Sequence, residues 1–284
     1  MQGAATVSES PVVRVGEATT RDYAVTASTV VFRVLREELC VGLPRVESGA
    51  GLRRTVPCAR PDALALDAGL DAAARIAAGK CVPIADIVRV GSAGVRVIAN
   101  PDSTSTMHIV SWAIARPLAS QSGINKSVEA EEHFVPLSAL PTLDAGARSI
   151  LSCAFDAFLD VTLADALTRR LLPRHVLFRK TDGFNGRSPF EQALGAGASP
   201  EPSEPEIPLF VGLLPDPFPL SALRELYERL LGAPLDRGNF RRQFHDVIES
   251  GPIKALPIFE RGVPHRAGQL FTFDRAAWTR FAAK

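Results

Sequence analysis

Five hydrogen-bonding side chains are closely spaced near the C-terminus, at Arg237, Asn239, Arg241, Arg242 and His245. Arginine can pair bidentately with guanine, and asparagine with adenine, in the major groove of double-stranded DNA. The exposed faces of ordinary amphipathic helices also carry charge runs, but this stretch contains no acidic residue between 237 and 245. The residue types and their spacing therefore indicate a surface that could read base edges.

The residues around this stretch follow a helix-turn-helix pattern. Apolar residues recur at helical spacing over 220–231, where Ser221 is the expected N-cap and Gly232 the expected terminator. After a short turn, Asp236 is the expected N-cap of a second helix over 237–250. The apolar side of that helix falls within an arc of about 100°. It is formed by Phe240, Phe244, Val247 and Ile248.

A hairpin is predicted directly after the second helix. Residues 253–259 and 270–273 have the composition of strands, and the segment between them contains glycine, proline, Arg261, His265 and Arg266. A hairpin with a basic tip in this place is typical of a wing that contacts backbone phosphate or the minor groove. We therefore add these three tip residues to the predicted DNA-binding set.

The charge distribution agrees with this interpretation but does not carry it. The 284-residue chain has a formal net charge of only +1. Residues 220–284 hold 11 Lys and Arg against 7 Asp and Glu, whereas the rest of the chain holds 21 against 24. A basic C-terminal part beside a slightly acidic body suits contact with phosphate, although such an imbalance also occurs on ordinary surfaces.

Cysteine usage and hydropathy exclude several other classes. The four cysteines, Cys40, Cys58, Cys81 and Cys153, are widely scattered and form no CxxC pair, so we expect reduced thiols and neither a zinc site nor disulfides. We expect no metal and no cofactor. No apolar run approaches the roughly 20 residues of a membrane span, and the N-terminal residues lack the features of a signal peptide. We expect a cytoplasmic protein that makes no membrane contact.

The N-terminal part reads as a mixed α+β domain. Strand-like segments occur at 23–36, 38–43, 88–98, 107–115 and 133–137. We expect the second to return antiparallel to the first and 107–115 to be central. Helical patterns cover 67–79, which ends in glycine, and 149–172. Residues 194–208 are rich in Gly, Ala, Ser, Pro and Glu, which predicts a linker or mobile loop.

Two C-terminal phrases, LLPDPFPLSALRELYERLLGAPLDRGNFRRQF and GVPHRAGQLFTFD, resemble the winged-helix domain of the Nudix-related transcriptional regulators of NAD metabolism, the NrtR family, over about 65 residues. HFVPLSALPTLDAGARSIL resembles the end of that family's Nudix-like domain. Gly238 departs from the family pattern, in which a larger residue is usual. The resemblance implies a flexible N-terminus at 1–21, a Nudix-like α/β/α sandwich at 22–172, an insertion or linker at 173–208, and a winged helix-turn-helix domain at 209–284.

The same resemblance places the Nudix helix at 66–82, with the sequence LDAGLDAAARIAAGKCV. A catalytic Nudix helix carries clustered glutamates that hold the divalent ions for attack on a pyrophosphate. No glutamate occurs between Glu47 and Glu129, so we expect no catalytic residues and no enzyme. The alternative is an atypical hydrolase that uses Glu129, Glu131 and Glu132.

The resemblance implies a DNA-binding regulator, most simply a repressor, that binds a palindromic operator as a homodimer. Its Nudix-like domain is then either a sensor of an ADP-ribose-like or other nucleotide-like effector, or a structural dimerisation domain. Arg53, Arg54 and Arg60 could meet phosphates of such an effector or could be ordinary surface arginines. A further alternative is an adaptor whose winged helix contacts protein.

Overall fold

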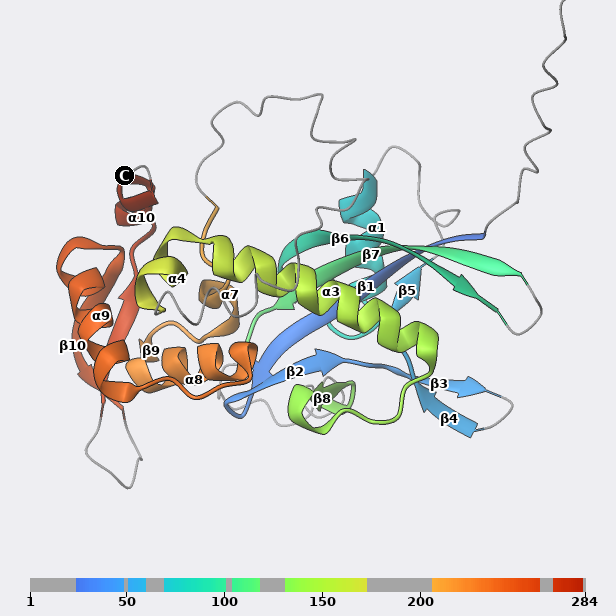
Figure 1. Cartoon of the computed structure of the whole chain (residues 1–284), viewed down its shortest axis with the longest axis horizontal. Helices are drawn as coiled ribbons and strands as arrows, with labels where there is room; N and C mark the ends of the chain where they lie inside the picture. The colour runs from blue at the N-terminus through green and yellow to red at the C-terminus, as the bar shows by residue number, and fades with distance from the viewer. Residues whose placement is uncertain are drawn as a thin grey trace, which may run out of the picture.

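The computed structural model describes residues 24–48, 51–59, 69–100, 104–117, 131–172, 206–260 and 268–282. Its N-terminal body is a six-stranded mixed sheet in the order β6-β7-β1-β2-β8, with β5 also paired to β1 (Figure 1). β1 runs parallel to β7, and the other paired strands are antiparallel. The strands of this sheet are β1 (Ala24–Leu35), β2 (Glu38–Gly42), β5 (Cys58–Ala59), β6 (Ile87–Ala99), β7 (Ser105–Ala115) and β8 (Phe134–Pro136).

Helices cover both faces of this sheet because its central strands are apolar on both sides. Val30 and Phe32 of β1 pack in the core on the side of α3 (Ala145–Ala164), whereas Val31 and Ala113 pack with the end of α1 (Gly69–Ala78). The result is an α/β/α sandwich. Smaller elements complete the body, namely the hairpin β3 (Arg45–Ser48) and β4 (Gly51–Arg54) and the 3-10 turns η3 (Ile84–Asp86) and η4 (Leu137–Ala139).

The predicted strands are confirmed within a residue or two for the part of the chain that is described. β2 returns antiparallel to β1, and the strand predicted as central, 107–115, lies between β6 and β1. The helix predicted at 67–79 is described from Gly69 to Ala78 and is followed by Gly79. Tyr23 and residues 67–68 lie outside the described ranges.

The prediction of one helix over 149–172 is wrong. α3 begins at Ala145, where the Asp144 carboxylate accepts a hydrogen bond from the Ala147 N–H. The chain is extended at Asp165 and starts a second helix, α4 (Ala166–Leu171). The Asp165 carboxylate accepts from the N–H groups of Leu167 and Thr168, so it acts as the N-cap of α4 and ends the long helix.

A close approach of two strands requires glycine at position 91. A Cβ atom there would lie 2.1 Å from Cζ2 of Trp112, whose side chain is buried. We expect Gly91→Ala to lower the free energy of unfolding by about 1–3 kcal/mol through overpacking, measured by urea denaturation. The matched control is Gly238→Ala in a helix near the C-terminus, where the new Cβ meets its nearest atom at 3.4 Å. That change should be neutral or stabilising, and equal losses in both variants would contradict the prediction.

Among the described residues from Phe218 onward, the C-terminal part contains three helices and a three-stranded sheet in the order β10-β11-β9. β11 is therefore the central strand and pairs antiparallel with both neighbours. The elements are β9 (Phe218–Pro219), α8 (Leu220–Leu231), α9 (Arg237–Ser250), β10 (Ile253–Phe259), β11 (Gln269–Phe273) and α10 (Arg275–Ala282). The hairpin of β10 and β11 is the wing that the sequence predicts.

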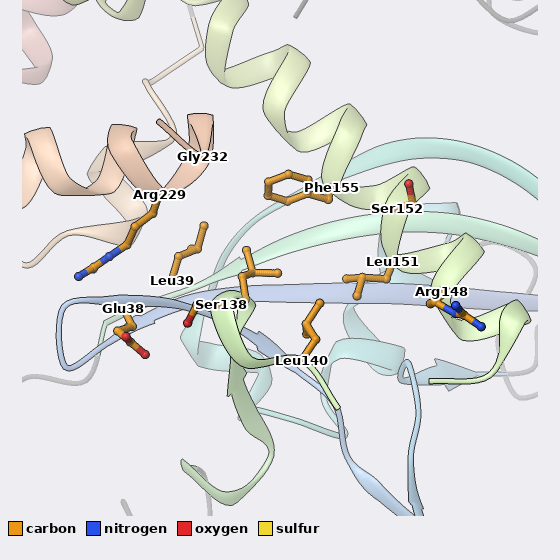
Figure 2. Close-up of a pocket in the computed structure, with 11 residues that line it drawn as sticks. Glu38, Leu39, Ser138, Leu140, Arg148, Leu151, Ser152, Phe155, Arg229 and Gly232 are labelled. Carbon is orange, nitrogen blue, oxygen red and sulfur yellow. The ribbon is translucent and has the colours of Figure 1, made fainter. Parts of the chain in front are cut away.

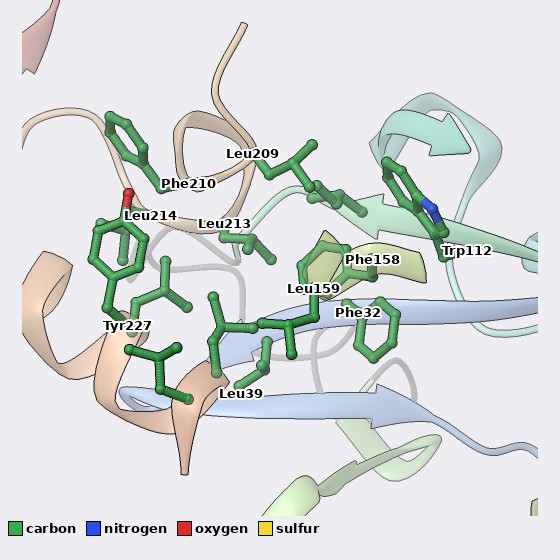
Figure 3. Packing of buried hydrophobic residues seen from close by; sticks show 14 of the residues in the cluster. Phe32, Leu39, Trp112, Phe158, Leu159, Leu209, Phe210, Leu213, Leu214 and Tyr227 are labelled. Carbon is green, nitrogen blue, oxygen red and sulfur yellow. The ribbon is translucent and has the colours of Figure 1, made fainter. Parts of the chain in front are cut away.

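The hydrophobic cluster on the α3 side of the sheet continues into the C-terminal part (Figure 3). Phe158 of α3 stacks on Phe32 of β1 with ring centroids 4.5 Å apart. Phe210 of the short helix α7 (Phe210–Leu213) belongs to the same cluster and contacts Phe218 at the start of the C-terminal sheet. α7 itself packs on β7 and β1. The two parts therefore share one apolar interior.

Polar contacts also join the two parts. α4 packs against α9, and the buried hydroxyls of Thr168 in α4 and Tyr227 in α8 lie 2.7 Å apart. Burial raises the pKa of both Tyr227 and Asp165, the N-cap of α4. The guanidinium of Arg170 lies 4.2 Å from the ring centroid of Phe281 in α10. The end of the predicted linker is likewise attached to the body, because Arg89 of β6 donates a hydrogen bond to the Ile207 carbonyl oxygen.

The cysteines are free thiols, as predicted. Burial raises the pKa of Cys40 to about 11 and that of Cys81 to about 12, so both remain protonated at neutral pH. Within the described ranges, no helix has the length and apolar character needed to cross a membrane.

Candidate nucleic-acid interface

The turn between α8 and α9 is held by side chains that also fix the start of α9. Gly232 ends α8 in the left-handed region at φ 63°, where glycine carries no steric cost. The carboxylate of Glu228 accepts hydrogen bonds from the Leu235 N–H at 2.9 Å and from Arg224 at 2.6 Å. Asp236 then caps α9 by accepting from the Asn239 N–H at 2.8 Å. The predicted terminator and the second predicted N-cap are confirmed.

The predicted N-cap of α8 is wrong. Pro219 precedes the helix in an extended conformation because it pairs with Leu270 of β11. The first turn therefore begins at Leu220, and Ser221 lies inside the helix with an exposed side chain. Sequence preference alone favoured serine, but the strand pairing sets the boundary.

Aromatic contacts anchor α9 to the wing. Phe240, Phe244 and Val247 are buried, and Ile248 is partly buried, as the sequence predicts. The Phe244 ring meets Phe271 of β11 edge to face, with centroids 4.9 Å apart. Because the buried face of α9 is fixed in this way, its other faces hold a defined orientation toward solvent.

A groove of about 920 Å³ lies between α9, the first turn of α8 and the strands of the wing. Arg237, Arg241 and His245 line it from α9. They are spaced four residues apart and so form one stripe along the helix. All three side chains are exposed.

The other two predicted helix residues lie apart from this stripe. Arg242 and Asn239 are exposed and do not line the groove. The second half of α9 is less cationic, because Glu249 lies 3.2 Å from the His245 ring nitrogen and Asp246 is exposed nearby. The cationic surface is therefore concentrated in the first two turns of α9, the part of a recognition helix that reaches base edges.

Two hydrogen bonds between Glu260 and Gly268 join the wing strands where the tip loop begins. The Glu260 N–H donates to the Gly268 carbonyl oxygen at 2.9 Å, and the Glu260 carboxylate accepts from the Gly268 N–H at 3.0 Å. Residues 261–267 lie outside the described ranges, and with them the predicted tip residues Arg261, His265 and Arg266. Their contact with DNA stays a prediction.

Other side chains that the sequence did not place in the DNA-binding set also line the groove, among them Ser221, Phe259, Glu260 and Gln269. Ser221 places a hydroxyl near the N-terminus of α8, where backbone N–H groups favour phosphate. Phe259 is 56% exposed, although it belongs to a strand. The signal available in the sequence was an aromatic residue next to the predicted wing tip, because apolar wing residues can enter the minor groove.

Comparison with known proteins agrees with this geometry. Residues 210–273 match the model of the NrtR DNA-binding winged helix domain. The C-terminal domain is an NrtR-type winged helix. The matched range begins with α7 and ends with β11, so it contains the helix-turn-helix, the groove and the wing of the NrtR-type domain.

Solved structures extend the likeness to most of the chain. Shewanella oneidensis NrtR complexed with a 27mer DNA aligns over 89% of this chain and 95% of its own, at 14% identity and a TM-score of 0.56. NrtR of the same organism without DNA aligns over the same shares, at 13% identity and a TM-score of 0.54. A MutT/nudix family protein from Enterococcus faecalis aligns over 90% of this chain and 89% of its own, at 10% identity and a TM-score of 0.48. Among curated protein sequences, none matches this chain.

The chain thus shares the overall fold of the solved NrtR structures, with an α/β/α sandwich followed by a winged helix of the NrtR type. α1 is the helix that the family resemblance predicts to be the Nudix helix, and its Ala73, Ala74 and Ala77 are buried in the core. On its outer side Asp71 pairs with Arg75 at 2.8 Å. Within the described part of the chain, no three His, Cys, Asp or Glu side chains are grouped to hold a metal ion.

The acidic alternative site is partly described. Glu131 forms an ion pair with Arg36 at 2.9 Å, and the Glu132 carbonyl oxygen accepts from Arg54 at 3.1 Å. Arg54 also donates a hydrogen bond to the Leu43 carbonyl oxygen, so its guanidinium stabilises the fold. Arg53 lies beside Arg54 on β4, whereas Glu129 and Arg60 lie outside the described residues.

Proposed function

We propose that this protein is a transcriptional regulator, most simply a repressor, that binds double-stranded DNA through its NrtR-type domain. The observation that supports this most directly is the stripe of Arg237, Arg241 and His245 along the groove between α9 and the wing. Guanidinium groups in that position can pair with guanine edges in the major groove while the wing contacts backbone. Arg242 and Asn239 extend the same contact on the outer side of α9.

We further propose that a homodimer recognises a palindromic operator. Two recognition helices would then contact half-sites about one helical turn apart, or a multiple of it. The test is selection of bound fragments from genomic and random DNA by the full-length protein at moderate salt, with sedimentation to establish its oligomeric state. An inverted repeat should be enriched by the native chain and lost in an Arg237→Glu/Arg241→Glu variant.

Three outcomes would oppose these proposals. Absence of any enriched motif with folded protein would favour an adaptor whose winged helix contacts protein. A strictly monomeric chain would remove the reason to expect a palindrome. An enriched motif that survives the double charge reversal would place DNA recognition elsewhere on the surface.

We also propose that the Nudix-like body is a sensor or dimerisation domain without catalytic activity. This rests on α1, whose inward residues are alanines and whose Asp71 is paired with Arg75. Placing an activating metal ion requires several carboxylates at one point. A nucleotide-like effector remains compatible with this role, because binding does not require these carboxylates.

Incubation with ADP-ribose and magnesium or manganese should therefore release no product above the protein-free blank, measured by chromatography of the nucleotides. The matched variant is Glu129→Gln/Glu131→Gln/Glu132→Gln, which removes the acidic alternative site. Steady metal-dependent turnover by the native chain that this variant abolishes would show that the body is an atypical hydrolase. Binding of the nucleotide without turnover would support the sensor role.

A further inference from the structure

A second cavity lies on the α3 side of the sheet, where the body meets the end of α8 (Figure 2). Its volume is about 570 Å³, within the roughly 300–1,000 Å³ range of small-molecule sites. α3, β2 and η4 supply most of its walls, and Arg229 and Gly232 of α8 close one side. It is separated by the sheet from α1, the predicted Nudix helix, because Leu39 belongs to the core on the α3 side.

The walls combine an apolar centre with charge at both ends. Figure 2 shows Leu39, Leu140, Leu151 and Phe155 in the middle. The Leu140 side chain is 39% exposed, which is unusual for a leucine in the packed interior of a protein. The remaining polar lining residues are Glu38, Ser138, Arg148, Ser152 and Arg229.

The two ends differ in their electrostatics. Arg229 shares its end with Glu38, so its positive charge is partly offset there. Arg148 lies at the opposite end beside Ser152. Within the described part of the chain, no carboxylate forms an ion pair with Arg148. A negatively charged group is therefore best placed at Arg148, where it would gain a charge-assisted hydrogen bond.

We propose that this cavity binds a small organic anion with an aromatic or aliphatic body, with its carboxylate at Arg148 and its body against Phe155. Such a ligand touches the body and α8 together. α8 continues through Gly232 and Asp236 into α9, so occupancy would bias the orientation of the recognition helix. This regulatory consequence rests on the proposed DNA-binding function, whereas the binding itself does not.

The test is calorimetric titration of the full-length protein, without DNA, by 2-naphthoate and decanoate. We expect saturable binding of at least one probe at one site per chain. 2-Naphthol lacks the anionic group, so it should bind at least about ten-fold more weakly than 2-naphthoate. Arg148→Ala should remove this preference.

Ser152→Trp, at an exposed position of α3 that lines the cavity, should block both probes. Arg116→Ala, an exposed arginine outside the cavity, is the matched control and should bind normally.

Absence of saturable binding at millimolar probe by folded protein would overturn the proposal. Binding that persists unchanged in both Arg148→Ala and Ser152→Trp would overturn it as well. Ser138→Trp serves as a second blocking variant if Ser152→Trp does not fold by circular dichroism. Loss of a dimer in the blocking variants, without probe binding by the native chain, would instead identify this face as an interface between copies. Failure to bind DNA would leave the titration result intact, so the two proposals fail separately.

Discussion

Arg241→Ala should weaken binding to the selected operator by about 1–3 kcal/mol, which corresponds to roughly 5- to 150-fold in Kd, and should relax the sequence preference. Arg241 lies in the middle of the stripe along the groove, one turn from Arg237 and one turn from His245. The substitution would remove both the proposed bidentate contact to a guanine edge and the positive charge. Fluorescence anisotropy with the operator and with a scrambled duplex gives both the affinity and the preference.

Two further variants separate recognition of bases from non-specific electrostatic attraction to DNA. Arg280→Ala removes an exposed arginine from α10, outside the groove, and should leave the operator affinity nearly unchanged. Arg266→Ala at the predicted wing tip should weaken operator and scrambled duplex equally and reduce the salt dependence of log K by about one unit. An Arg241→Ala protein that is folded and binds the operator like the native chain would assign recognition to other residues.

Phe244→Ala should cost about 3–5 kcal/mol in the free energy of unfolding. The ring is 1% exposed and contacts both Phe240 and Phe271. Its removal leaves a cavity between the recognition helix and the central strand of the C-terminal sheet, where the surrounding elements cannot easily collapse. Urea denaturation followed by circular dichroism measures the loss.

The matched control is Phe259→Ala in the same part of the chain. Phe259 is 56% exposed, so its removal should change the free energy of unfolding by less than about 0.5 kcal/mol. The same variant should weaken DNA binding, because Phe259 lines the groove. A loss of stability at Phe259 that matches the loss at Phe244 would mean that the wing strand is packed differently from the structure described above.

Patterns that depend on local physics were predictable from the sequence. The alternating and continuous apolar runs located β1, β2, β6, β7 and β8 but missed the short strands β3, β4 and β5. Asp236 and Gly232 fixed the ends of their helices. These signals act within a few residues and need no knowledge of distant partners. The family resemblance then supplied the α/β/α architecture that the strand pattern alone left open.

Features set by distant partners were not predictable in the same way. The N-cap at Asp165 is a local signal, but the α4 helix that follows it packs against the distant α9, and the start of α8 depends on pairing of Pro219 with Leu270. α10 was missed because its helical pattern spans only eight residues, although its Trp278 is buried. The sequence likewise could not place the wing relative to α9, so Arg242 was predicted together with the residues that line the groove.

The shared interior affects how the chain can be divided. A cut near residue 208 follows the change in composition, but it would separate Leu209, Phe210 and Leu213 from the β7 and β1 surface on which α7 packs. The isolated C-terminal fragment would carry these side chains into water and become prone to self-association. Heating the intact chain should accordingly unfold the sheet and the winged helix in one cooperative transition. A force applied to either part should likewise be transmitted to the other.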